Sequence, residues 1–230
     1  MTKPFSFTYS KLSDYEQCGL KHQQATILKR PDLAPGGDAI DYGNRVHEAF
    51  KNALKDDQPL PIQMQYLQYW VDWVKSLPGI RHTEIKWGLT RDFQPVEFRT
   101  NMAWMRFIAD VAVVHGSVGW LIDWKTGKRI EEPLQLWLGA ACMFAQFSEL
   151  EVVDSMFIWL KEDDGKNSHE CISAETLKRS DVGEIWDQLL PRISVYEDAV
   201  ASDTFFPKPG YHCRWCRVGK DVCEFSGVRQ

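Results

Sequence analysis

The stretch Ala109–Lys128, ADVAVVHGSVGWLIDWKTGK, constrains the fold more than any other part of the chain. Two apolar runs, Val111–Val114 and Val118–Trp124, flank the short segment His115-Gly116-Ser117. Apolar runs of this length on either side of a glycine-containing break are typical of two strands joined by a tight turn. The sequence therefore predicts a β-hairpin here.

Three charged side chains belong to this hairpin. Asp110 comes just before the first apolar run, and Asp123 and Lys125 lie at the end of the second. Residues two apart on a strand share a face, so Asp123 and Lys125 project together, and Asp110 can lie near them across an antiparallel pair. Carboxylate oxygens suit Mg²⁺ or Mn²⁺, and an ammonium can orient a water or neutralise developing charge. The set predicts a magnesium-dependent phosphodiester hydrolase; the alternative is an ordinary surface hairpin that ends in a charged turn.

Hydrophobic periodicity outlines the rest of the chain. It predicts helices over Tyr9–Leu28, Asp38–Leu54, Ile62–Leu77, Pro133–Leu150 and most of Ala174–Ala201, and Pro191 should kink or split the last of them. It predicts strands over His82–Thr90, Asn101–Val114, Val118–Lys125, Val152–Leu160 and Ser168–Ser173, with a turn at Asp163–Lys166. This order predicts an α/β fold with one central mixed β-sheet flanked by helices.

Length and charge bound the function classes. The 230 residues suffice for a single domain over residues 1–230, and 44% hydrophobic residues is an ordinary globular composition. A net charge of −5 counts against tight non-specific DNA binding but allows a local basic groove. No apolar run is long enough to span a membrane, and MTKPFSFTYSKLS lacks the apolar core of a signal peptide. We therefore expect a cytoplasmic protein without a membrane partner.

Four cysteines form a split pattern at the two ends of the chain. Cys213 and Cys216 are spaced as C-x2-C, Cys223 follows them, and Cys18 lies near the other terminus. Four thiolates can hold an iron–sulfur cluster or Zn²⁺. Such a site would act as a staple between the two ends, residues 1–30 and 203–230, and so restrict the unfolded chain. The alternative is a set of unligated thiols.

The segment Asp123-Trp124-Lys125-Thr126-Gly127 resembles the D-x-K-T-G motif of the RecB/AddB-like branch of the PD-(D/E)XK nuclease superfamily. The predicted element order is also similar to the αβββαβ restriction-endonuclease-like core of that superfamily. The resemblance implies a metal-dependent DNA nuclease, with exonuclease action on single strands or duplex ends favoured. It implies that Asp110 and Asp123 bind Mg²⁺ or Mn²⁺ and that Lys125 orients the attacking water.

The same resemblance implies three further site residues. His47, in Gly43-Asn44-Arg45-Val46-His47, matches a G-x-x-x-H helix whose histidine helps to bind metal. Glu84 precedes the aspartate strand and would hold a second metal or a water, and Gln135 would contact phosphate or base from the start of a helix. The alternatives without a functional role are a hydrogen-bonded histidine, a solvent-facing glutamate and an exposed glutamine. The tyrosine that often follows the glutamine by one turn is replaced here by Gly139. Lys128 and Arg129 would touch phosphate, or are solvated charges.

The cysteine pattern is similar to that of RecB-type nucleases with a 4Fe–4S cluster, among them CRISPR-associated exonucleases. Cys18, Cys213, Cys216 and Cys223 would then be the cluster ligands, with Zn²⁺ as the alternative occupant. Cys142 and Cys171 are expected to be buried, unligated thiols. Two rival functions stay open: a non-catalytic nucleic-acid-binding module, and an iron–sulfur or zinc regulator on the same fold.

Overall fold

The computed structural model describes residues 4–130, 132–163 and 169–227. The chain divides into two compact units. Unit 1 combines Met1–Pro35 with Asp187–Gln230, and unit 2 is the continuous segment Gly36–Trp186. Unit 2 contains the β-sheet and the predicted hairpin, whereas unit 1 contains the four cysteines at the two ends.

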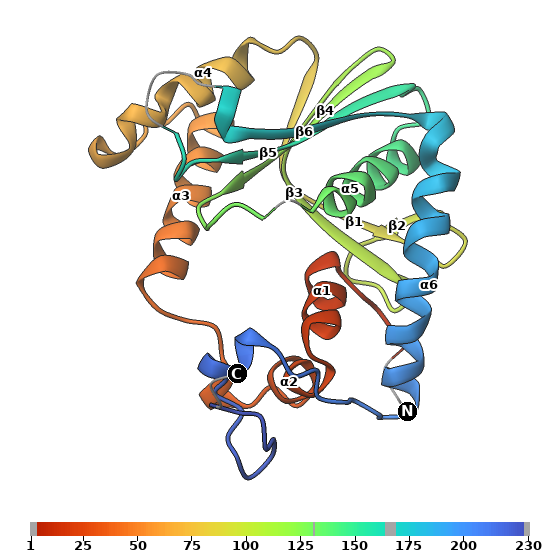
Figure 1. Cartoon of the computed structure of the whole chain (residues 1–230). Helices are drawn as coiled ribbons and strands as arrows, with labels where there is room; N and C mark the ends of the chain where they lie inside the picture. Colours follow the sequence, from red (N-terminus) through yellow and green to blue (C-terminus); the bar gives the residue numbers. More distant parts are fainter. Residues whose placement is uncertain (1–3, 131, 164–168, 228–230) are drawn as a thin grey trace. The chain divides into compact units, whose positions relative to one another are not determined.

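A mixed sheet in the order β2-β1-β3-β4-β5-β6 forms the centre of unit 2 (Figure 1). Its strands are β1 (Ile80–Leu89), β2 (Pro95–Glu97), β3 (Met105–His115), β4 (Val118–Lys125), β5 (Val152–Trp159) and β6 (Ile172–Lys178). Neighbouring strands are antiparallel except for β4 and β5, which are parallel. A parallel pair needs a crossover connection, and α5 (Pro133–Gln146) supplies it.

The sheet splits in its middle. The pairing of β3 with β4 runs from His115↔Val118 only as far as Val111↔Ile122. Beyond that point β3 continues to pair with β1, as far as Leu89↔Met105, and β4 continues to pair with β5, as far as Lys125↔Trp159. The two halves of the sheet therefore diverge directly after the predicted hairpin.

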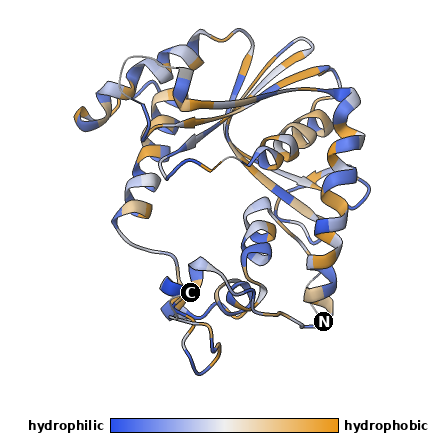
Figure 2. Ribbon diagram, viewed as in Figure 1, coloured by the Kyte–Doolittle hydropathy of each residue, from blue (hydrophilic) through white to orange (hydrophobic). Residues whose placement is uncertain are grey.

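Helices cover the two faces of the sheet. Helix α3 (Asp38–Lys55), the short 3₁₀ helix η3 (Ile62–Leu67) and α4 (Gln68–Ser76) share one core with the sheet. Its members include Val46, Phe50, Trp70, Val111, Ile122, Trp124 and Ile158. Helix α5 packs against the other face, where a Cβ on Gly139 would lie 2.5 Å from Leu121 and 2.7 Å from Phe107. In Figure 2 hydrophobic residues run along most of α5, whereas α3 mixes hydrophilic and hydrophobic residues. This difference agrees with the eight buried residues of α5 and the five of the longer α3.

Unit 1 consists mainly of helices and turns. Its elements are α1 (Tyr9–Gln17), α2 (Gly19–His22), a π-helical turn η1 (Gln23–Ile27), the 3₁₀ helices η2 (Pro31–Leu33) and η6 (Tyr211–Trp215), and most of α6 (Val182–Ala201). The short 3₁₀ helices η4 (His169–Cys171) and η5 (Arg179–Asp181) belong to unit 2. The N–H of Leu20 donates to the carbonyl of Phe206 at 3.1 Å, which joins the two ends of the chain. Gly19 permits this approach, because a Cβ there would lie 3.0 Å from the same carbonyl oxygen.

The predicted fold class is confirmed: the chain has an α/β fold with a central mixed sheet. The helix Asp38–Leu54, the hairpin and the strand Val152–Leu160 are confirmed to within about two residues. The predicted helix Tyr9–Leu28 is wrong as one element, because Cys18 is extended (φ −167°, ψ 108°) and separates α1 from α2. The predicted helix Ile62–Leu77 begins as a 3₁₀ helix rather than an α-helix.

The chain after β5 departs most from the prediction. Residues 174–178 are not helical but belong to β6, which pairs with β5 from Ile158↔Ile172 to Val152↔Lys178. Helix α6 continues through Pro191, so this proline does not split the helix. The predicted turn Asp163–Lys166 and the start of the strand at Ser168 fall largely on residues 164–168, outside the described part. None of the described helices is long and apolar enough to cross a membrane.

Candidate metal centre

Asp110 lies where β3 and β4 diverge. Its Oδ2 accepts a hydrogen bond from the backbone N–H of Trp124 at 2.8 Å, so this side chain replaces the ladder bond lost at the split. Asp123 precedes Trp124 on β4, and the carboxyl groups of Asp110 and Asp123 share a hydrogen bond. The two carboxyl groups therefore meet on one side of the hairpin, as the register 111↔122 requires.

His47 reaches the same point from α3. Its Nδ1 lies 2.8 Å from Oδ1 of Asp110, and this carboxylate accepts from the ring N–H. Burial lowers the pKa of His47, but the hydrogen bond and the charge of Asp110 outweigh it, so the pKa is raised overall. Burial raises the pKa of Asp110, whereas its bonds to His47, Asp123 and the Trp124 N–H lower it, and the net shift is downward.

Glu84 completes this cluster through an unusual backbone conformation. It lies within β1 at φ +51°, in the left-handed region, which costs a non-glycine residue about 1–3 kcal/mol. The rings of His82 and Trp87 both contact Phe147, with centroids 5.7 Å and 6.1 Å away. Residues five apart would face opposite sides of an unbroken strand, so the alternation changes between them, at Glu84.

As a result, one ligand atom from each of His47, Glu84 and Asp110 lies within 4.8 Å of the others. Burial raises the pKa of Glu84, the charge of Asp110 adds to this effect, and His47 and Lys51 oppose it. A divalent cation would stabilise the ionised form of a half-buried carboxyl group that lies beside another carboxylate.

Lys125 lies beside the cluster. Its ammonium forms an ion pair with Oδ2 of Asp123 and lies 4.5 Å from the ring centroid of Phe157 on β5. Oδ2 of Asp123 is buried, and burial raises the pKa of Asp123; the charge of Lys125 opposes this shift, and that of Asp110 adds to it. The ammonium is thus held between a carboxylate and an aromatic face, both adjacent to the metal-ligand candidates.

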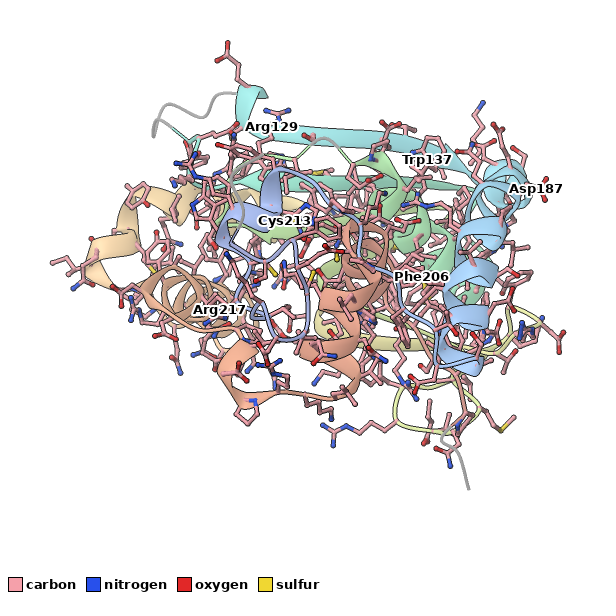
Figure 3. All side chains as sticks on the ribbon, turned by 60° about the horizontal axis from the view of Figure 1, so that its bottom comes forward. Arg129, Trp137, Asp187, Phe206, Cys213 and Arg217 are labelled. Atoms are coloured by element: carbon pink, nitrogen blue, oxygen red, sulfur yellow. The ribbon has the colours of Figure 1, made fainter. Side chains whose placement is uncertain are left out.

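Three other residues predicted to contact DNA lie outside the group formed by His47, Glu84 and Asp110. Gln135 is half-buried in the first turn of α5, outside the group formed by His47, Glu84 and Asp110. The guanidinium of Arg129 donates to the carbonyl of Glu170 at 2.6 Å and to Oγ of Ser173 at 2.9 Å, so it anchors the loop after β4 to the start of β6 (Figure 3). Arg129 is therefore not a freely solvated charge, and its contact with phosphate stays a prediction. Lys128 is exposed.

Sequence reasoning missed two contributors to this centre. The N–H of Trp124 belongs to the backbone and has no signature of its own in the sequence. In the sequence, Phe157 is one more apolar residue of a buried strand, and only the parallel register Asp123↔Phe157 brings it beside Lys125. The number of residues between two strands cannot reveal such a register.

A second cluster lies in unit 1. Cys18, Cys213, Cys216 and Cys223 all line one pocket, together with apolar residues such as Leu20, Val218 and Phe225. The backbone N–H of Lys208 points to Sγ of Cys18 at 3.5 Å. Among the described residues, no three of these sulfurs lie within 4.8 Å of one another, so the thiols are near neighbours but do not form a closed cluster. Cys142 and Cys171 are buried elsewhere, in unit 2, and burial raises the pKa of both thiols.

A mixed sheet that splits at two carboxyl groups, with a histidine, a glutamate and a lysine around them, defines an α/β protein with a candidate site for a divalent cation. A family model described as the PD-(D/E)XK nuclease superfamily matches residues 6–224, and the chain therefore belongs to that superfamily.

Comparison with solved structures shows similarity to a protein described as "Crystal structure of SSO0001". The two share 12% sequence identity, and the match covers 85% of this chain and 78% of the other, with a TM-score of 0.42. The search of curated proteins found no match.

Proposed function

We propose that this protein is a Mg²⁺- or Mn²⁺-dependent deoxyribonuclease of the RecB-like type that acts as an exonuclease on single strands or duplex ends. The observation that carries the proposal is the position of Asp110. Its carboxylate joins His47 to the Trp124 N–H and touches Asp123, whose partner is Lys125. One acidic side chain thus links every predicted group of the D…D-x-K set.

The donor set fits such a cation. Glu84 and Asp110 offer carboxylate oxygens, which Mg²⁺ and Mn²⁺ prefer, and the imidazole nitrogen of His47 is compatible with Mn²⁺ in particular. Asp123 lies outside this group of three and is paired with Lys125, so its role as a further ligand is part of the proposal. The raised pKa values of Glu84 and Asp123 support the same assignment, because burial, with a smaller contribution from the charge of Asp110, disfavours their ionised forms and a cation would favour them. A bound cation would polarise the scissile phosphate and lower the pKa of a water molecule.

The side chains of the protein supply the remaining steps. The ammonium of Lys125, held against Phe157, would orient the attacking water and neutralise charge that develops on the phosphate. His47 and the Trp124 N–H fix the orientation of the Asp110 carboxylate, so that this ligand needs little reorganisation. The water would attack phosphorus, and the P–O bond to the leaving sugar oxygen would break in line with it; the hydroxyl group stays on the phosphate and a proton goes to the leaving oxygen.

Cleavage of labelled DNA tests this proposal. End-labelled single-stranded and duplex DNA should be degraded from the ends when Mg²⁺ or Mn²⁺ is added, whereas circular DNA, which has no ends, should stay intact. Asp123→Ala and Lys125→Ala should each abolish cleavage, whereas Lys55→Ala, at the exposed end of α3, should cleave at nearly the normal rate. Undiminished cleavage by both site variants would rule out the mechanism. Binding of DNA by the unaltered protein without cleavage in Mn²⁺ would favour a non-catalytic module instead.

We also propose that the cysteine pocket of unit 1 holds a 4Fe–4S cluster, with Zn²⁺ as the alternative. All four predicted ligands line the one pocket, and the N–H of Lys208 is placed to stabilise a thiolate on Cys18. A zinc ion with Zn–S bonds of about 2.3 Å would hold the sulfurs closer together than they now lie, whereas a four-iron cluster fits wider spacing. Iron and zinc analysis of protein purified without air, with a visible spectrum, decides between the two. Cys213→Ala should lose the bound metal, and Cys142→Ala should keep it.

A further inference from the structure

The segment Thr204–Lys220, TFFPKPGYHCRWCRVGK, has an unusual charge for this chain. It contains two lysines, two arginines and a histidine but no acidic residue, although the whole chain has a net charge of −5. The segment belongs to unit 1, so it lies in a different unit from Asp110 and the candidate metal centre. Its cationic character is therefore a local property of unit 1.

Large aromatic side chains on this segment face solvent. Phe206 is 74% exposed, Tyr211 is 69% exposed and Trp215 is 60% exposed. The rings of Tyr211 and Trp215 contact each other edge to face, with centroids 4.7 Å apart. Exposed aromatic groups that gather in one place are typical of binding surfaces, because their exposure to water is unfavourable without a partner.

Cationic groups lie beside these rings. The guanidinium of Arg214 is 5.3 Å from the ring centroid of Trp215, and Arg214 is exposed. Trp215 also lines a groove with Lys21, His212 and Arg217, within the same unit. One Nη of Arg217 donates to the carbonyl of Ala34 at 3.3 Å, which fixes the position of its charge at the edge of the groove. Figure 3 shows Cys213 and Arg217 on the same C-terminal loop.

We propose that this aromatic–cationic surface, formed by Tyr211, Arg214, Trp215, Arg217 and Lys21, binds single-stranded polynucleotide. Unpaired bases would stack on the rings of Tyr211 and Trp215, and the phosphates would lie near the three cations. Flat exposed rings interleaved with positive charge match the alternation of bases and phosphates along a single strand. A duplex hides the faces of its bases, so it could use the charges but not the rings. The proposal goes beyond the proposed function, because it assigns a strand-binding site to the unit that lacks the metal centre.

Fluorescence anisotropy with labelled oligodeoxythymidine, on the full chain without added divalent cation, measures this binding. The double variant Tyr211→Ala/Trp215→Ala should weaken affinity about tenfold or more, since stacking contributes about 1–3 kcal/mol per base. Replacing Trp215 by phenylalanine instead of alanine should restore most of the lost affinity, because phenylalanine keeps an aromatic face. Tyr66→Ala, which removes an aromatic side chain that is 50% exposed in unit 2, is the matched control and should stay within twofold. Both altered residues are exposed, and equal thermal unfolding temperatures would show that the variants fold.

Charge is tested separately from stacking. Arg214→Gln/Arg217→Gln should reduce the slope of log affinity against log salt concentration by about 1 to 1.5, the share of two phosphates on a single strand. Unchanged affinity of the Tyr211→Ala/Trp215→Ala variant would overturn the proposal. Equal affinity for duplex, or equal competition by polyglutamate, would overturn it too, because either result means that charge alone is recognised. If the protein binds the oligonucleotide through Trp215 but never cleaves DNA, the proposed nuclease activity is refuted and the proposed binding surface still holds.

Discussion

The carboxylate of Asp110 lies 2.8 Å from the backbone nitrogen of Trp124, at the point where the β3–β4 ladder stops. An acidic side chain therefore takes over a hydrogen bond that a strand would otherwise supply. This relationship ties the local fold and the candidate metal centre to the same residue, and the two roles can be separated by substitution.

Asp110→Asn should separate them. An amide oxygen can still accept from the Trp124 N–H, but the negative charge is lost, so cleavage should disappear while the fold is retained. Asp110→Ala should also destabilise the protein, by about 1–3 kcal/mol, because it leaves the backbone N–H without this acceptor. Urea unfolding checks the difference in stability between the two variants, and nuclear magnetic resonance of His47 checks the charge. Loss of the Asp110 charge should lower the pKa of His47; equal stability of both variants would contradict the assigned role of the hydrogen bond.

His22 should make unit 1 sensitive to acid. It is 2% exposed, its Nε2 lies 2.8 Å from the hydroxyl oxygen of Tyr196, and burial, with a smaller effect of Lys11, lowers its pKa to about 4. Because the unfolded chain titrates near pH 6.5, it binds the proton more tightly than the folded chain does. Stability is therefore complete above about pH 6.5 and falls as the pH drops towards 4, by at most about 3 kcal/mol.

The comparison with His22→Gln isolates this effect from the titration of carboxylates. The difference in unfolding free energy between the variant and the unaltered protein should shrink, or change sign, between pH 7.5 and pH 4.5. A difference that stays constant over this range would show that His22 is not buried in its neutral form.

Phe157→Leu should reduce cleavage without abolishing it. The substitution removes the ring that faces the ammonium of Lys125, an interaction of about 0.5–2 kcal/mol, so the rate should fall roughly 2- to 30-fold. Phe144→Leu is a matched control: Phe144 is also buried and also faces a cation, Arg179, but it lies on α5 away from Lys125. Single-turnover rates should fall for the first variant and change little for the second. Equal losses in both would indicate a general effect of core packing.

Arg129→Ala should lower stability rather than DNA affinity. The guanidinium donates to the carbonyls of Glu170 and Ile172 and to Oγ of Ser173, and loss of such charged hydrogen bonds costs about 1.5–3 kcal/mol. Thermal unfolding should therefore shift downwards, while the salt dependence of DNA binding keeps its slope. A reduced slope with unchanged stability would instead support the phosphate-binding interpretation of Arg129.

The hairpin and the main helices could be predicted because their signals are local. Val118–Lys125 has the apolar content of a buried strand, and α3 has helical spacing between Val46, Phe50 and Leu54. By contrast, residues 174–178, AETLK, favour a helix by composition, yet they pair with β5, so tertiary contacts override propensity there.

The prediction of the site was limited by features that have no sequence signature. Glu84 could be named as a candidate, but its left-handed backbone could not, since such conformations are expected of glycine or asparagine. In the sequence alone, Gly139 marks only the position where the expected tyrosine is absent. The structure gives the reason: even a Cβ there would lie within 2.7 Å of both Leu121 and Phe107, so no larger side chain fits.

The arrangement of the two units sets an order of events during synthesis. Unit 2 is one uninterrupted segment, Gly36–Trp186, and it can fold as soon as that stretch leaves the ribosome. The helices before Gly36 must wait, because their partners arrive only with the segment after Trp186. Nascent chains stalled after Trp186 should therefore already protect the metal centre from protease, while Cys18 still reacts with thiol reagents.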